Sequence, residues 1–368
     1  MKIRELTQVL EKIAPPQYQE SYDNAGLIVG NPMTEITGVL VCLDSTEAVI
    51  VEAIERGCNV VVAHHPIVFK GLKRLNGKNY VERTVMLAIK NDVAIYAIHT
   101  NLDNMLHNGV NTKIAEKLGL KNLKILAPKR EILMKLTTFA PVADSQKVLD
   151  ALYSAGAGNI GNYKNCSFRT EGIGTFKPTG AANPHIGTLG KDEEVVEHRL
   201  EVVFPSYLER TILHTLRAAH PYEEVAFYVQ KIENEHQEVG AGIVGNLSEA
   251  MTEMDFLQFL KKQMQAGVVR FTRPLITNVK KVKKVAICGG AGSFLLPNAM
   301  ASGADVFVTA DYKYHEFFDA DGRILIADIG HFESEQFTID LLIEILAKEK
   351  PDLEIFSTRI CTNPVNYL

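Results

Sequence analysis

Short apolar runs that alternate with helical stretches dominate the first third of this sequence. The runs are "GVLVCLD" (38–44), "NVVVAHH" (59–65) and "DVAIYAIHT" (92–100), and the stretches between them have helical periodicity. Runs of this kind are typical of strands that are buried on both faces of a sheet. Repeated strand–helix–strand units form a largely parallel sheet that helices cover. The sequence therefore predicts an α/β fold.

The same order returns near the other end of the chain. The runs there are "KVAICGG" (284–290), "ADVFVTAD" (304–311) and "RILIADIGH" (323–331). Val39 corresponds to Val285 at an offset of 246 residues (285 − 39). Val60 corresponds to Val306 at the same offset (306 − 60). A constant offset predicts an internal duplication of a β-α-β-α-β unit. Two unrelated crossovers of similar length are the alternative.

The middle of the chain has a different order of elements. Residues 129–237 are predicted to form a strand, a helix, two strands, a helix and a strand. The order β-α-β-β-α-β is that of ferredoxin-like α+β domains. We therefore expect an inserted domain at 129–237 that separates the two halves of one α/β domain, 1–128 and 238–368.

Composition limits the classes of function. The net charge is −5, so the chain as a whole offers no basic surface for nucleic acid or for an anionic membrane. No apolar run approaches the roughly 18–20 residues that a membrane span requires. The five cysteines are scattered and odd in number, which favours a reducing compartment over a disulfide framework. We expect a cytoplasmic protein.

Imidazole and carboxylate side chains follow the predicted strands. In a parallel α/β sheet, ligands bind beyond the carboxyl ends of the strands. The residues at or near these ends are His64, His65, His99, Asp103, Asp311, His331 and Glu335. His331 and Glu335 are spaced i, i+4, so both lie on one face if "HFESEQFTIDLLIEILAK" is a helix. Such a pair at a helix start is suitable geometry for a metal site.

The adjacent histidines suggest two ions rather than one. Neighbouring side chains of an extended chain point to opposite faces, so His64 and His65 would not reach the same ion. Two cations roughly 3.5–4 Å apart remove this conflict. We expect His65 and Asp103 on one ion, and His64 with His331 on the other. Glu335 would bridge both ions beside a water or hydroxide. This ligand set suits Zn²⁺ first, with Fe or Mn²⁺ as alternatives, better than Ca²⁺ or Mg²⁺.

Other residues near the predicted strand ends have weaker signals. His99 is interpreted either as an outer partner or proton shuttle of the metal site, or as a buried structural histidine. Asp311, Asp328, His315 and Glu316 are either pocket residues or, as the preferred interpretation, residues that cap helices or lie on the surface.

A glycine run, "CGGAGS" (288–293), follows a predicted strand. Glycines in this position can bind a phosphate through backbone amides. The run lacks the Lys-Ser/Thr of a Walker A loop, so a tight strand-to-helix turn is the preferred interpretation.

Four motifs resemble those of the NIF3 family of dinuclear-metal proteins, whose members are also named GTP cyclohydrolase 1 type 2 homologues. They are "SYDNAGLIVG" (21–30), "AHHPIVF" (63–69), "HTNLDN" (99–104) and "GHFESE" (330–335). The resemblance implies a NIF3-like α/β fold and a ring-shaped homohexamer with its sites facing an inner cavity. It also implies a bimetal site, whose ligands would be His64, His65, Asp103, His331 and Glu335.

The predicted insert contains "HPYEEVAFYV" (220–229), which is similar to a stretch of the trimeric CutA and PII-like domains. That similarity implies trimer contacts or a lid over the cavity. His185, His198, His214 and His220 are expected to be structural or solvated rather than ligands.

The family resemblance implies a metal-dependent hydrolase that acts on a nucleotide. In the cyclohydrolase reaction, a hydroxide would attack C8 of the guanine ring of GTP and formate would be released, with His99 as a candidate acid. A different bimetal hydrolase, cleaving a phosphoester or an amide, would use the same activated water. A non-enzymatic metal-binding or regulatory scaffold, with the insert sensing a small ligand, is the other alternative.

Overall fold

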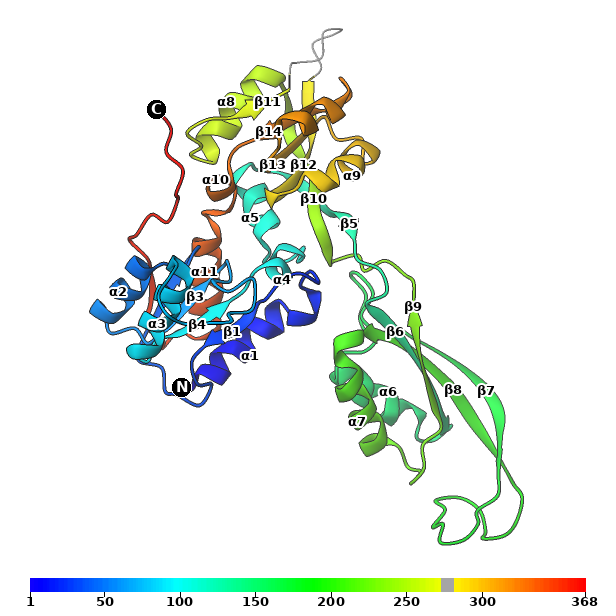
Figure 1. The fold of residues 1–368 in the computed structure, drawn as a ribbon. Coiled ribbons are helices and arrows are strands. Elements are labelled where there is room, and N and C mark those ends of the chain that lie inside the picture. Colours follow the sequence, from blue (N-terminus) through cyan, green and yellow to red (C-terminus); the bar gives the residue numbers. More distant parts are fainter. Residues whose placement is uncertain (273–280) are drawn as a thin grey trace. The chain divides into compact units, whose positions relative to one another are not determined.

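The computed structural model describes residues 1–272 and 281–368, which form two compact units (Figure 1). Unit 1 contains residues 1–128 together with the described part of 238–368, and unit 2 contains residues 129–237. Each unit has its own sheet structure and its own hydrophobic core.

The first sheet of unit 1 has the order β1-β4-β3-β2-β15. Its centre is formed by the parallel strands β2 (Val39–Cys42), β3 (Val60–Ala63) and β4 (Ala94–Ala97), whose residues are all buried. The edge strand β1 (Gly26–Val29) is antiparallel to β4, whereas β15 (Ile355–Ser357) is parallel to β2. The apolar runs predicted near the start of the chain therefore form a parallel sheet with one antiparallel edge.

The second sheet of unit 1 has the order β11-β14-β13-β12-β10-β5. Its parallel strands are β12 (Lys281–Ala291), β13 (Val306–Ala310) and β14 (Leu325–Asp328). The antiparallel strands, which the sequence reasoning did not identify, are β10 (Gly240–Thr252), β5 (Lys121–Pro128) and β11 (Arg270–Phe271).

The two sheets share a register that matches the sequence offset. Val39 lies opposite Val60 in the first sheet. Val285 lies opposite Val306 in the second sheet. The four valines that correspond at an offset of 246 residues thus occupy equivalent places in two different sheets.

Helices cover both sheets of unit 1. They are α1 (Ile3–Ile13), α2 (Glu47–Glu55), α3 (Tyr80–Lys90), α4 (Thr100–Asp103), α5 (Val110–Lys117), α8 (Glu253–Gln263), α9 (Leu296–Ala301), α10 (His331–Glu335) and α11 (Thr338–Glu349). Between β13 and β14, residues Tyr314–Ala320 form a 3-10 helix. In the described ranges no helix is long and apolar enough to cross a membrane.

Alternate residues of the strands pack into different cores. Val39 and Val285 lie in one core that both sheets share with residues of α1, α5, α8 and α11. The next residues, Leu40 and Ala286, face away from it, toward α2 and α3 or toward α9. Each fully buried valine or leucine side chain contributes about 1.5–3 kcal/mol to stability. Both sheets are consequently fixed against one core, and their carboxyl ends are held in place.

The helix predicted to start at His331 is interrupted. It ends as α10 at Glu335, and α11 begins at Thr338 after a two-residue turn. Phe337, at the turn, is buried in the shared core. The spacing of His331 and Glu335 on one helical turn is kept.

Unit 2 is one four-stranded antiparallel sheet with two helices. Its elements are β6 (Leu133–Pro141), α6 (Ser145–Ser154), β7 (Ser167–Phe176), β8 (Glu193–Pro205), α7 (Glu209–Ala219) and β9 (Phe227–Ile232). The order of the strands is β7-β8-β6-β9. Leu152 of α6 and Leu216 of α7 pack with Leu200 and Phe204 of β8 in a separate core.

Candidate metal centre

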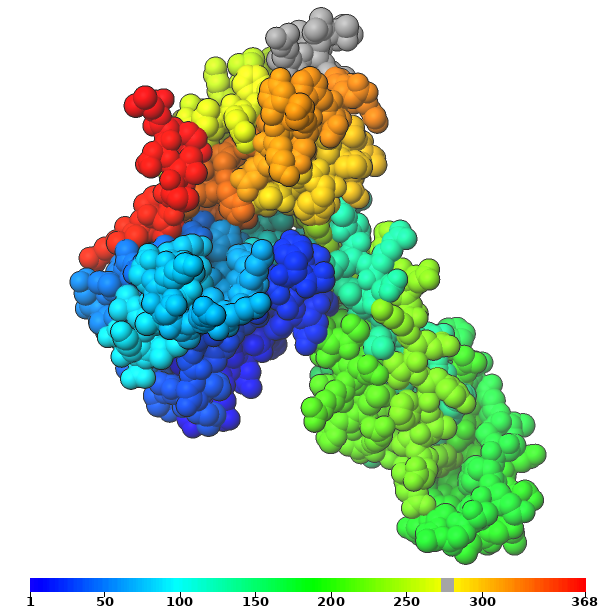
Figure 2. All heavy atoms as spheres, viewed as in Figure 1, coloured from blue at the N-terminus to red at the C-terminus, as the bar shows by residue number. Residues whose placement is uncertain are grey.

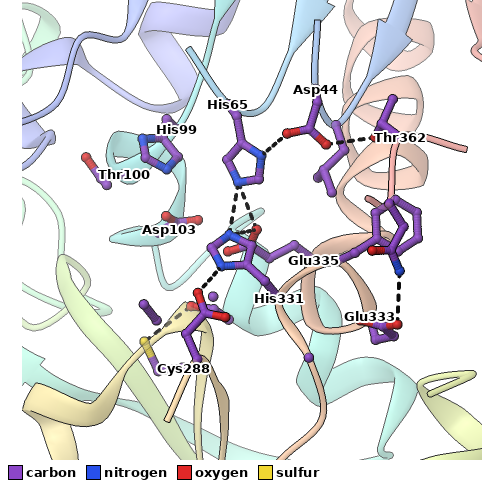
Figure 3. Close-up of a pocket in the computed structure, with 18 of the residues that line it drawn as sticks. Asp44, His65, His99, Thr100, Asp103, Cys288, His331, Glu333, Glu335 and Thr362 are labelled. Carbon is purple, nitrogen blue, oxygen red and sulfur yellow. Dashed lines mark hydrogen bonds and ion pairs between the residues drawn. The ribbon is translucent and has the colours of Figure 1, made fainter. Parts of the chain in front are cut away.

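The carboxyl ends of strands from both sheets meet at a cavity of about 1200 Å³ in unit 1. Four of the five predicted ligands line it, namely His65, Asp103, His331 and Glu335. The fifth, His64, is fully buried, and its Nε2 lies 3.5 Å from Asp103 Oδ1 and 3.9 Å from Glu335 Oε2. Figure 3 shows His65, His331 and Glu335 pointing toward one another. The structure therefore brings all five predicted ligands together.

His64 presents an unprotonated nitrogen to two carboxylates. Its Nδ1 lies 2.9 Å from the carbonyl oxygen of Ile98, which only accepts, so Nδ1 carries the hydrogen and Nε2 the lone pair. Burial lowers the pKa of His64 to about 3, so the ring is neutral at physiological pH. Within residues 1–272 and 281–368, neither His64 Nε2 nor Asp103 Oδ1 has a hydrogen-bond partner. A cation between these atoms would satisfy both, and the donor set fits a transition-metal ion.

A second group of ligand atoms surrounds Glu335 Oε2. This oxygen lies 3.0 Å from His65 Nε2 and 3.1 Å from His331 Nε2. On the far side of each ring, His65 Nδ1 lies 2.8 Å from Asp44 Oδ1, and His331 Nδ1 lies 2.7 Å from Asp311 Oδ2. Carboxylates in this position fix the hydrogen on Nδ1 and direct Nε2 toward a metal, as in many metalloproteins.

The charges in the second group are strongly coupled. Burial by itself would lower the pKa of His65, but hydrogen bonds with Asp44 and Glu335 outweigh it and raise that pKa to about 10. Burial by itself would also lower the pKa of His331, but hydrogen bonds with Asp311 and Glu335 outweigh it and raise that pKa to about 11. The two imidazolium ions hold the pKa of Glu335 well below its usual value despite burial. Without a cation, protons on these rings neutralise the buried carboxylate.

The ligand atoms fall into groups that differ from the predicted pairing, and one further group joins His64, His65 and His99. His64 groups with Asp103 and Glu335, and His65 groups with His331 and Glu335. The prediction assumed an extended chain through the doublet. Strand β3 ends one residue before His64, and both histidines lie in a bend, with ring centroids 4.8 Å apart. Their relative directions are therefore set by the bend and by the partners of each Nδ1.

His99 lies at the edge of the cluster. Its ring makes T-shaped contacts with the rings of His64 and His65, with centroids 5.3 Å apart in both pairs. Its Nδ1 lies 2.8 Å from Asp23 Oδ1, and the backbone N–H of Thr100 donates to Asp23 Oδ2 at 3.0 Å. Burial would raise the pKa of Asp23, but the bonds with His99 and Thr100 lower it to about 2. His99 is thus held by an ionised carboxylate beside the ligand cluster.

Sequence reasoning missed Asp44 and Asp23, and it misjudged Asp311. Asp44 ends the run "GVLVCLD", so it carries the same strand-end signal as the predicted ligands. The capping or surface role preferred for Asp311 is wrong, and the alternative pocket role is confirmed, because its carboxylate lines the cavity and holds His331. Asp328 accepts from two backbone N–H groups, and Glu316 accepts from one at the start of its 3-10 helix, so these two are structural.

The glycine run makes room for a ligand. A Cβ on Gly290 would lie 2.4 Å from Glu335 Oε1, and Gly290 has a φ of +63°. The amide of Gly290 donates to Ser334 Oγ and that of Gly289 to Asn111 Oδ1, each at 2.9 Å. Because both amides already donate to side chains of the protein, they are not available to bind a phosphate. Gly289 and Gly290 lie at the end of β12, and Gly292 follows in the predicted turn, where it precedes the 3-10 helix Ser293–Leu295.

Comparisons with known proteins cover the whole chain. A model of the family described as Duf34/NIF3 (NGG1p interacting factor 3) matches residues 1–364. A Bacillus subtilis (strain 168) protein named "GTP cyclohydrolase 1 type 2 homolog" is 37% identical over 370 residues, which span 99% of this chain and 98% of the relative. A crystal structure of a Bacillus cereus protein related to NIF3 is 36% identical with a TM-score of 0.86, over 100% of this chain and 99% of that one. A Staphylococcus aureus protein of solved structure is 30% identical with a TM-score of 0.77, over the same shares. The chain belongs to the Duf34/NIF3 family.

Proposed function

We propose that unit 1 is a dinuclear-metal hydrolase that acts on a nucleotide. The observation that carries the proposal is the buried lone pair of His64 Nε2, which faces oxygens of Asp103 and Glu335 and has no hydrogen-bond partner among the described residues. Burial and the charge of Glu335 raise the pKa of Asp103 well above its usual value, so a cation among these three side chains would replace the proton that Asp103 otherwise holds. Zn²⁺ is the first candidate, with Fe and Mn²⁺ as alternatives.

The proposed ligands divide into two groups that Glu335 joins. His64 and Asp103 would hold one ion, and His65 and His331 would hold the other. A pair of bound cations supplies a hydroxide at neutral pH and a place for developing negative charge. The carboxylates beyond the second group keep each Nε2 directed inward.

His99 is the proposed proton donor or acceptor of the reaction. Its bond with Asp23 leaves Nε2 as the nitrogen that can exchange a proton. In the proposed reaction, one water adds to C8 of the guanine ring of GTP and one C8–N bond breaks to give a formamide. A second water then hydrolyses the formamide to release formate, and a nearby acid protonates each nitrogen that leaves.

The nucleotide substrate is supported by the name of the relatives and by the walls of the cavity. The curated relatives are named "GTP cyclohydrolase 1 type 2 homolog". The cavity has room for a nucleotide, and the exposed rings of Tyr22, Phe69 and Phe294 at its lining can stack on a base.

Formate release tests this proposal. Purified, metal-loaded protein would be incubated with GTP, with phosphodiesters and with peptides. Formate from GTP that His65→Ala abolishes supports the cyclohydrolase reaction, and turnover of only the other substrates indicates a different bimetal hydrolase.

A non-enzymatic metal-binding or regulatory scaffold is the second candidate, and one observation favours it. Unit 2 has its own cavity of about 670 Å³, lined in part by Phe139, Phe176 and Tyr222 and by the buried Glu197. A small ligand in that cavity could regulate the assembly. If no substrate is turned over and a small ligand shifts the melting temperature, the scaffold is the correct function.

We further propose that unit 1 arose by duplication and that unit 2 is an inserted ferredoxin-like domain of the PII/CutA type. Equivalent registers of Val39–Val60 and Val285–Val306 support the duplication. We expect a ring-shaped homohexamer in the cytoplasm, with trimer contacts through unit 2. Light scattering on the purified protein gives its mass, and a monomeric or dimeric mass would contradict the ring.

A further inference from the structure

Residues 358–368 follow β15 as a segment without helix or strand. The segment runs over the surface of unit 1, where it is drawn in red in Figure 2. Five of its residues line the cavity of the candidate metal centre, namely Thr362, Asn363, Pro364, Val365 and Tyr367. The last residues of a chain are poorly ordered unless specific contacts tie them down. Two side-chain hydrogen bonds supply such contacts at the metal centre.

The first of these bonds reaches His65 through one carboxylate. Thr362 Oγ1 donates to Asp44 Oδ2 at 2.7 Å. The other oxygen of that carboxylate, Oδ1, lies 2.8 Å from His65 Nδ1. Figure 3 shows this row from Thr362 through Asp44 to the imidazole. The hydroxyl therefore fixes the carboxylate that orients the ring.

The second bond reaches the helix that carries the other ligands. Asn363 Nδ2 donates to Glu333 Oε1 at 3.1 Å. Glu333 is buried and lies between His331 and Glu335 on α10. Asn363 therefore restrains the helical turn from which both ligands project.

We propose that Thr362 and Asn363 are positioning residues of the metal centre, a role that rests on the proposed function. Thr362 acts through Asp44 on His65, and Asn363 acts through Glu333 on α10. In metal sites, loss of such an outer partner typically lowers affinity about 10–100-fold.

The effect of Thr362 is expected to be confined to one ion. His64 is oriented by the carbonyl of Ile98, not by the segment. Among the described residues, no hydrogen bond joins residues 358–368 to His64 or Asp103. Removal of the Thr362 hydroxyl therefore weakens the His65–His331 group and leaves the ion at His64 and Asp103 bound.

The test is a Zn²⁺ titration of metal-free, full-length protein against a competing chromophoric chelator. Thr362→Val removes the hydroxyl with little change of shape. Thr358→Val is the matched control, because the Thr358 hydroxyl in the same segment donates at 2.5 Å to Glu52, a carboxylate that otherwise accepts from Arg56 and from the amide of Arg359. We expect two equivalents in the wild type. In Thr362→Val the second equivalent weakens at least about 10-fold, whereas Thr358→Val and Thr362→Ser match the wild type.

The outcomes separate the two proposals. A wild type that binds no Zn²⁺ would overturn the metal function and this inference with it. If Thr362→Val binds two equivalents of Zn²⁺ with unchanged affinity, the inference is overturned but the metal function stands. The same holds if Thr358→Val weakens Zn²⁺ binding as much as Thr362→Val does. If circular dichroism shows that Thr362→Val is unfolded, Asn363→Leu provides the second measurement. It leaves Asp44 untouched, is expected to weaken both equivalents because α10 carries Glu335 as well as His331, and overturns the inference if both ions stay tight.

Discussion

Gly290→Ala is expected to abolish the metal centre with only a modest loss of stability. Gly290 has a φ of +63°, and a Cβ there would lie 2.4 Å from Glu335 Oε1 and 3.2 Å from His331 Cε1. Ordinary contact begins at 3.4 Å, so the carboxylate would have to move by 1.0 Å (3.4 − 2.4). Metal–ligand distances tolerate about ±0.2 Å. Because Glu335 belongs to both ligand groups, one methyl group would disturb both ions.

The cost in folding stability comes mainly from the backbone. An L-residue with a left-handed conformation costs about 1–2 kcal/mol. For a domain of ~150–250 residues, each kcal/mol lowers Tm by about 2–4 °C. Gly303→Ala is the matched control, because Gly303 has a φ of +72° and a Cβ on it would have nothing within 4 Å.

Metal analysis and thermal melts of Gly290→Ala and Gly303→Ala test this expectation. Both variants should melt several degrees lower than the wild type when all three proteins are metal-free. Gly303→Ala should keep two ions per chain, and Gly290→Ala should bind less than one. Two tightly bound ions in Gly290→Ala would refute the assignment of Glu335 as the shared ligand.

Three further predictions concern protons and carboxylates. The pKa values of His65 and His331, about 10 and 11 without a cation, mean that metal binding at neutral pH displaces one proton from each ring, so affinity rises with pH up to about 10. Calorimetry in buffers of different ionisation enthalpy should show the release of at least two protons. The release of no protons would contradict the ligand set. Asp311→Asn should weaken the ion at His331 about 10–100-fold, measured by chelator competition, while the ion at His64 stays bound. Asp23, whose folded pKa of about 2 lies below its ordinary 3.8, stabilises the fold above pH 4 and loses that contribution as the pH falls to 2. The stability of Asp23→Asn should not show this loss between pH 4 and pH 2. An acid unfolding profile equal to that of the wild type would contradict the prediction.

Strand ends were the part of the site that the sequence could predict. Because parallel strands place their carboxyl ends at one edge of a sheet, side chains at the ends of "NVVVAHH" and "DVAIYAIHT" were expected to lie near one another, as were those at the ends of "ADVFVTAD" and "RILIADIGH". The same rule, which placed Asp311 at a strand end, would also have found the outer carboxylate of Asp44. Asp44 was overlooked, and Asp311 was assigned to a less specific role.

Other features depended on contacts that no pattern records. The pairing of His64 with Asp103 is set by the carbonyl of Ile98, a backbone group that any residue would supply. Residues 358–368 have no periodicity, so their approach to the cavity could not be read from the sequence. The antiparallel strands β5 and β10 were missed because their partners are distant in the chain.

Anomalous scattering from crystals grown with Zn²⁺ tests the central claim most directly. We predict two peaks per chain, about 3.5–4 Å apart. One should lie among His64, Asp103 and Glu335, and the other among His65, His331 and Glu335. A single peak, or zinc bound away from these side chains, would contradict the account.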